Sequence, residues 1–209
     1  MGLAISTHFL ADMLENDAEG AEWIKKNLEV VNALLAENDL PQHVEPTTRT
    51  TKLRQHCGSF PYSFLHYLRR AFAYVHEGQA LTPVEEGADP SEDRLIEEAG
   101  TLFDTHLLCH SDAEGYYVPV DFSEVIFDLE ERGLPGGSLG STQRLMAELV
   151  ETAPAIGIDL KEGQLTDAVV AKINADEDGA PYYRERLVWL ALFEAARVSI
   201  ADKTLIVFN

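Results

Sequence analysis

The sequence contains few cysteines and no long apolar run. Cys57 and Cys109 are the two cysteines in 209 residues, too few for a disulfide framework. The longest strongly apolar run covers residues 187–193 and is far shorter than the roughly 20 residues that cross a bilayer. Residues 1–14 lack the basic start, the long apolar stretch and the cleavage site of a signal peptide. These absences predict a cytoplasmic protein with reduced cysteines.

Positive charge is also scarce. The chain has 16 Lys and Arg against 36 Asp and Glu, which gives a formal net charge of -20. The resulting field repels phosphate backbones and anionic lipids, so we expect neither nucleic acid nor a membrane as a partner. Paired carboxylates such as those at residues 85–86, 97–98 and 130–131 are typical of solvated faces unless the fold brings them together.

Residues 46–76 form a basic island, with five basic residues and no Asp or Glu. We expect these bases to pair with carboxylates of the same fold, or of a second subunit in a homo-oligomer. The alternative is an anion-binding patch, because Tyr62 and His66 share a predicted helix with Arg69 and Arg70. Aromatic rings interleaved with basic groups can stack on an anionic ligand and hold it.

The spacing of apolar residues predicts a mainly α fold. Apolar residues recur three and four positions apart in stretches that begin near residues 15, 59, 91, 141, 164 and 183, which predicts five or six helices. A small two- or three-stranded β element is expected from residues 47–53, 116–120 and 204–208. We expect a single domain over residues 1–209, with a long loop or subdomain boundary in the Pro-, Gly- and Glu-rich stretch 78–90.

Residues 174–185 resemble an EF-hand calcium loop. In that motif oxygen ligands occupy positions 1, 3, 5 and 12, and a glycine at position 6 allows a sharp turn. The pattern departs from the motif at its first residue and at Pro181, and the chain has no convincing second loop. The alternative is a solvated acidic connection between two helices. A calcium ion would be bound by Asn174, Asp176, Asp178 and Glu185.

A second set of candidate metal ligands lies between His106 and Glu114. His106 and His110 are four residues apart on a predicted helix and would project from one face, with Asp112 close by as an oxygen ligand or base. The two cysteines would add the sulfur ligands that zinc prefers if the fold brought them together. Such a site would support hydrolysis. The alternative is that this stretch packs in the core, where free cysteine is usually found.

Residues 136–140 fit the G-x-S-x-G pattern of a nucleophile elbow. Hydrolases with that motif place the catalytic histidine after the serine, whereas the last histidine here, His110, precedes Ser138. We therefore interpret the stretch as a glycine-rich turn in which Ser138 or Ser141 caps the following helix.

The charge leads to the main functional prediction, because it is the global property that departs from the average. We predict an acidic intracellular binding or inhibitory protein, of an immunity-like or regulatory kind, that engages a basic protein partner. The alternative is a small metal-dependent hydrolase that uses the His, Cys and carboxylate groups between His106 and Glu114. Zinc or calcium would be the cofactor of the two candidate metal sites.

Overall fold

A six-stranded mixed sheet forms the centre of the structure, a computed structural model that describes residues 2–209. The strands follow the order β2-β1-β6-β3-β5-β4 across the sheet. β3 and β5 pair in parallel, whereas the other neighbouring pairs are antiparallel. The strands are β1 (Gly2–Thr7), β2 (Ser59–Pro61), β3 (Gly115–Val118), β4 (Ile126–Phe127), β5 (Ser138–Ser141) and β6 (Ile206–Phe208).

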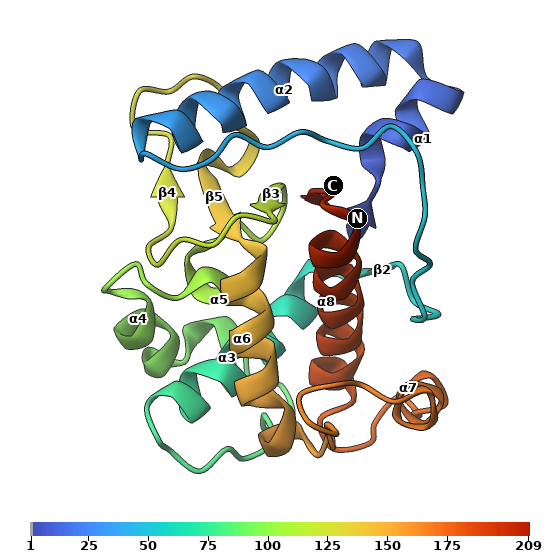
Figure 1. Ribbon diagram of the computed structural model, residues 1–209. Helices are drawn as coiled ribbons and strands as arrows, with labels where there is room; N and C mark the ends of the chain where they lie inside the picture. The colour runs from blue at the N-terminus through green and yellow to red at the C-terminus, as the bar shows by residue number, and fades with distance from the viewer. Residues whose placement is uncertain (1) are drawn as a thin grey trace.

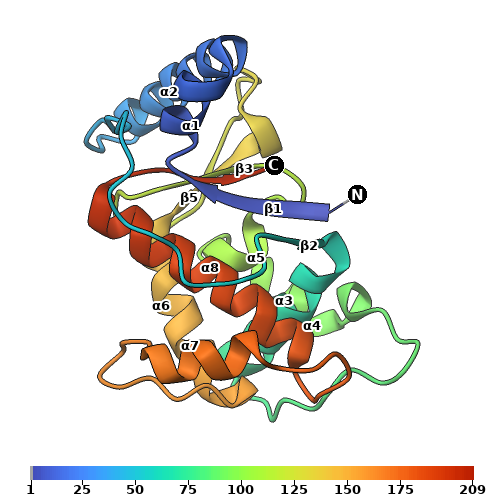
Figure 2. The same ribbon diagram turned by 90° about the vertical axis from the view of Figure 1, so that its right-hand side faces the viewer.

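Helices cover both faces of this sheet (Figures 1 and 2). One face carries α1 (Phe9–Asn16) and α2 (Ala18–Glu37). The short helix α4 (Arg94–Gly100) packs beside α3, and α7 (Asp167–Asn174) packs beside α8. Three 3₁₀ turns lie in the connections: η1 (Pro90–Glu92), η2 (Pro135–Gly137) and η3 (Ala153–Ile156). The other face of the sheet carries α3 (Tyr62–His76), α5 (His106–Cys109), α6 (Thr142–Thr152) and α8 (Tyr183–Asp202).

The core has two parts, one on each face of the sheet. Successive side chains of a strand point to opposite faces, and β3 shows this clearly. Tyr116 belongs to the apolar cluster beneath α2, where its hydroxyl accepts a hydrogen bond from Asn27 Nδ2 at 2.8 Å. Tyr117 belongs to the cluster around α8, and its hydroxyl donates to the His106 carbonyl at 2.9 Å. The sheet therefore has buried residues on both faces.

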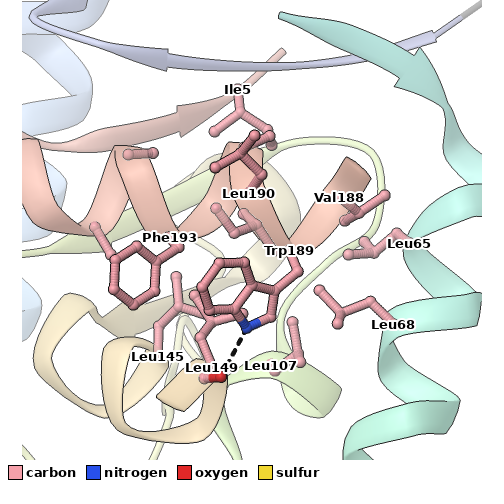
Figure 3. Packing of buried hydrophobic residues seen from close by; sticks show 14 of the residues in the cluster. Ile5, Leu65, Leu68, Leu107, Leu145, Leu149, Val188, Trp189, Leu190 and Phe193 are labelled. Atoms are coloured by element: carbon pink, nitrogen blue, oxygen red, sulfur yellow. Dashed lines mark hydrogen bonds between the residues drawn. The ribbon is translucent and has the colours of Figure 1, made fainter. Parts of the chain in front are cut away.

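Helix α8 is central to the larger cluster and is buried on nearly all sides. The indole Nε1 of Trp189 donates to the Leu149 carbonyl of α6 at 2.7 Å (Figure 3). Its ring stacks on Phe193 with 4.5 Å between centroids. The apolar run at residues 187–193 is thus part of a buried helix, as predicted. Among residues 2–209, no helix combines the length and hydropathy needed to cross a bilayer.

The prediction of a mainly α fold with a two- or three-stranded element is wrong. The described chain has eight α-helices and a six-stranded mixed sheet. The predicted strands at 116–120 and 204–208 do contain β3 and β6, which pair with each other, but residues 47–53 lie in the irregular connection between α2 and β2. The strands β1, β2, β4 and β5 were not predicted, because they form by pairing with segments that the sequence does not place beside them.

The predicted helix near residues 91–108 is two helices, α4 and α5. Phe103 lies between them with φ of 56°, a left-handed conformation that an α-helix cannot continue through. The loop expected at 78–90 is present between α3 and η1, and its role as a subdomain boundary stays a prediction. At residues 136–140, Ser138 is buried in β5 and Ser141 caps α6 by accepting a hydrogen bond from the Arg144 N–H, so one of the two expected caps is confirmed.

Gly140 allows β5 to lie closely beside β3. A Cβ at this position would lie 2.3 Å from Tyr117 Cδ1, and the Tyr117 side chain is fully buried. We expect Gly140→Ala to lower the free energy of unfolding, measured by urea titration, by about 1–3 kcal/mol, the usual cost of overpacking a core. Gly58→Ala is the control, because nothing lies within 4 Å of a Cβ there. Equal losses in the two variants would contradict this steric explanation.

Candidate protein-binding surface

Two arginines of the basic island are buried in the fold. Arg69 Nε donates to the Leu107 carbonyl at 2.9 Å, and a second guanidinium nitrogen donates to the carbonyl that follows α5. Arg70 Nε donates to Asp93 Oδ2 at 2.8 Å, and its Nη1 donates to the Thr82 carbonyl at 2.7 Å. These bonds connect α3 to α5, to the start of α4 and to the loop after α3. Both guanidinium groups therefore bind the chain itself.

Other bases of the island form ion pairs with distant carboxylates. Arg54 lies 2.6 Å from Glu194, whose side chain on α8 is fully buried, and 2.7 Å from Asp167 at the start of α7. Arg49 pairs with Asp12 of α1. These contacts confirm the expectation that bases of the island pair with carboxylates of the same fold.

The predicted anion-binding patch combines residues that now have other partners. His66 Nε2 lies 3.2 Å from Asp112 Oδ2, and Tyr62 is half-buried at the start of α3. An anion bound there would have to draw Arg69 and Arg70 away from their buried partners. The patch stays a prediction that these contacts do not favour.

Carboxylates dominate the surface, because the chain has more than twice as many acidic as basic residues. Of the 36 Asp and Glu, 26 are exposed, whereas nine of the 16 Lys and Arg are exposed. Residues 77–131 contain 16 of the acidic residues and a single Lys or Arg, Arg94. We call the 13 exposed carboxylates of this segment the acidic edge: Glu77, Glu85, Glu86, Asp89, Glu92, Glu97, Glu98, Asp104, Glu114, Asp121, Glu124, Glu130 and Glu131.

The segments that carry the acidic edge follow one side of the molecule, from the loop below α3 past α4 and α5 to β4 (left in Figure 1). The Val125 N–H donates to the Phe103 carbonyl at 3.0 Å and thereby joins the segment before β4 to the link between α4 and α5. At the upper end, Arg132 lies 2.5 Å from Glu37 at the end of α2. The carboxylate pairs at 97–98 and 130–131 therefore share one side, and the pair at 85–86 adjoins it.

The carboxylate pairs, taken one at a time, do not reveal this edge in the sequence. A running count of charge along the chain would have found it, since residues 77–131 hold nearly half of the acidic residues. The count would not have shown that Arg69 and Arg70, just before this segment, are buried. That information requires the fold.

The candidate zinc ligands have backbone partners. His106 Nδ1 accepts from the Ser141 N–H at 2.9 Å, and its Nε2 lies 3.2 Å from the Ser123 carbonyl. His110 is stacked on Tyr117 with 4.2 Å between centroids, and its two ring nitrogens lie near carbonyl oxygens. Burial lowers the pKa of both histidines to about 4. Within residues 2–209, no group of three or more His, Cys, Asp and Glu side chains is arranged to hold a metal.

The candidate calcium ligands are likewise held apart. Asn174 Oδ1 accepts from the His56 N–H at 3.0 Å, and Asp176 forms a salt bridge with Arg186. Glu185 is buried, which raises the pKa of its carboxyl group, whereas Asp178 is exposed. The EF-hand spacing is present in the sequence, but these side chains do not surround a common point.

Comparison with known proteins gives one match. The model of a family described as "Putative DNA-mimic protein" matches residues 1–208. No protein of curated function and no solved structure matches the chain. The family match supports a binding role for this acidic protein. It corrects the expected partners, because the prediction named a basic protein in general and set nucleic acid aside, whereas a DNA mimic engages proteins that bind DNA.

Glu148 of α6 is a buried carboxyl group behind the acidic edge. Its two oxygens accept hydrogen bonds from the N–H groups of His106 and Leu107, each at 2.6 Å, and thereby cap α5. Burial raises the pKa of Glu148 from 4.5 to about 8. Between pH 4.5 and about pH 8, the carboxyl group of Glu148 keeps its proton in the folded protein and loses it in the unfolded chain. The stabilisation is therefore fully present below pH 4.5 and is lost as the pH rises through about 8.

We expect the free energy of unfolding of the wild type to fall, relative to that of Glu148→Gln, by up to about 1.4 kcal/mol per pH unit in this window. Urea titrations from pH 5 to pH 9 measure the difference. Glu148→Gln has one acceptor oxygen in place of two, so it is less stable than the wild type at low pH. It has no carboxyl group to titrate, so its stability should not show this pH dependence. Glu151→Gln, at an exposed neighbour, should keep the wild-type slope. An unchanged slope in Glu148→Gln would show that Glu148 is already ionised in the folded protein.

Proposed function

The chain belongs to this DNA-mimic family, and we propose that its acidic edge occupies the DNA-binding surface of a partner protein. The observation that carries the proposal is the segregation of charge, with 16 acidic residues and one base in residues 77–131. A DNA-binding protein neutralises phosphates with Lys and Arg, and duplex DNA presents one negative charge for about every 1.7 Å of its axis. The carboxylates of the acidic edge offer the Lys and Arg of such a protein negatively charged partners.

The arrangement of the bases supports this proposal. Arg94, the base within the segment, lies 3.3 Å from Glu98 and is therefore partly neutralised. Arg69 and Arg70, which come just before the segment in sequence, are buried. Arg132 and Arg144 pair with two carboxylates of the acidic edge, and a partner that approaches it still meets a large excess of negative charge. Long-range attraction between such surfaces accelerates encounter and weakens as salt is added.

The proposed effect on the partner is competitive. While the acidic edge covers the DNA-binding surface, the partner cannot contact phosphates, so the fraction bound to DNA falls with the concentration of this chain. The action takes place where DNA-binding proteins work, which agrees with the expected intracellular location. The proposal requires no metal and no catalytic group, and it uses none of the residues between His106 and His110.

The test is elution from immobilised duplex DNA. Extract of the source cells is loaded on DNA–cellulose, and the column is washed with the purified chain at constant salt. We expect the chain to release one or a few DNA-binding proteins, which free duplex DNA also releases. The proposal would be overturned if the chain released none of the proteins that free duplex DNA releases.

Neutralising the acidic edge should abolish this release. A fivefold variant replaces exposed carboxylates by amides of nearly the same shape: Glu92→Gln, Glu97→Gln, Asp104→Asn, Glu124→Gln and Glu131→Gln. A matched control makes the same changes at exposed carboxylates outside residues 77–131: Glu15→Gln, Glu29→Gln, Asp159→Asn, Glu162→Gln and Glu177→Gln.

Both variants carry the same net charge, so net charge alone predicts the same result for both. We expect the edge variant to release the partner at least about tenfold less well, because each lost contact with a base removes part of the electrostatic attraction. The control should act like the wild type. Equal losses in the two variants would place the binding surface elsewhere.

A further inference from the structure

Apolar side chains are exposed in the middle of the acidic edge. Leu102 is 75%, Phe103 54% and Leu129 87% exposed. Phe127 lies between them in the fold, because its ring meets that of Phe103 edge-on with 5.2 Å between centroids, and it precedes Leu129 by two residues. We call these four residues the apolar patch. Exposed apolar side chains are unfavourable to hydrate, and a patch of them rimmed by charged residues commonly marks an interaction site.

Phe103 is held in its exposed position by the backbone. Its φ of 56° lies in the left-handed region, which is unfavourable for a residue with a side chain. Two hydrogen bonds maintain it: the Phe103 N–H donates to the Gly100 carbonyl at 3.3 Å, and the Phe103 carbonyl accepts from Val125 at 3.0 Å. Strain of this kind persists where the surrounding structure fixes it, and it is frequent at binding sites.

Leu129 is presented by a tight turn at the end of β4. Its N–H donates to the Phe127 carbonyl at 3.0 Å, and Asp128 accepts from the Leu134 N–H at 3.0 Å to close the turn. The residues that follow, Glu130 and Glu131, are both exposed carboxylates of the acidic edge. The turn therefore projects an apolar side chain beside two negative charges.

We propose that the apolar patch is the centre of the interface with the DNA-binding protein, and that the acidic edge is its rim. This inference rests on the proposed function. Protein interfaces commonly place apolar and aromatic side chains at a centre that excludes water and charged groups around it. The occupant is the DNA-binding surface of the partner, which has Lys and Arg around an apolar or aromatic side chain that normally contacts bases.

The partner's bases fit both parts of this surface. The aliphatic stems of Lys and Arg can cover Leu102 and Leu129 while their charged ends reach the carboxylates. An Arg guanidinium can also stack on an aromatic ring such as Phe103. The patch thus adds an attraction that salt does not screen, which a phosphate backbone does not supply. The protein should therefore resist release by salt better than DNA does.

The experiment uses the DNA-binding protein recovered from DNA–cellulose by the wild-type chain. Its dissociation constant is measured by calorimetry from about 50 mM to about 200 mM salt, a range over which a protein with several phosphate contacts loses about 10³–10⁵ in affinity. The patch variant is Leu102→Ser with Leu129→Ser, and both sites are too exposed to support the core. The control is Leu14→Ser with Val44→Ser, at exposed sites outside residues 77–131.

We expect the patch variant to bind roughly tenfold more weakly at every salt concentration, with an unchanged slope of log Kd against log salt, because about two buried methyl or methylene groups give this loss. The fivefold edge variant should instead have a reduced slope. Wild-type affinity in the patch variant, or an equal loss in the control, would overturn the patch and leave the proposed function standing. Failure of the wild type to recover any DNA-binding protein would overturn both.

Discussion

Ion pairs inside the fold determine which charges reach the surface. Arg54 and Arg197 both bind the fully buried Glu194, and Arg70 binds Asp93. Removing one member of a buried pair strands the other and typically costs about 3–5 kcal/mol. These bases cannot turn outward without that loss. The excess of carboxylates on the surface follows from the composition, and these ion pairs determine which of the few bases are withdrawn from it.

The same ion pairs and hydrogen bonds oppose the loss of stability that a net charge of -20 causes. Repulsion among surface carboxylates opposes the compact state, and it is strongest where they are densest. The acidic edge lies over elements that are firmly attached, because Arg69 and Arg70 connect α3 to its neighbours and Glu148 caps α5. In the core, Trp189 secures α8 to α6. The repelling groups are thus supported by a rigid interior.

The sequence predicted what depends on local spacing. The helices α2, α7 and α8, the Ser141 cap and the positions of strands β3 and β6 follow from apolar periodicity and from short-range residue preferences. The short strands β4 and β5 could not be recognised, since their pairing depends on partners that the sequence does not place beside them. The break at Phe103 is similar, because a hydrogen bond from Val125 holds its unusual backbone.

The candidate sites show the same division. The sequence identified the basic island, and three of its five bases, Arg49, Arg54 and Arg70, pair with carboxylates of the same fold as expected. It proposed metal ligands from spacing alone, but His106 and Asn174 have backbone partners that no local pattern reveals. The acidic edge was visible as composition, whereas the apolar patch within it was not. A leucine in a sequence is normally expected in the core, and only the fold shows that Leu102 and Leu129 are exposed.

The two-residue strand β4 closes one end of the sheet, next to carboxylates at residues 124, 130 and 131. An unpaired strand edge is a template on which chains can stack into aggregates, and short strands with nearby charge discourage this. A surface selected to resemble a polyanion would thus also act as a gatekeeper against aggregation. The apolar patch could then remain exposed at high protein concentration, because the charge around it keeps other copies of the chain away.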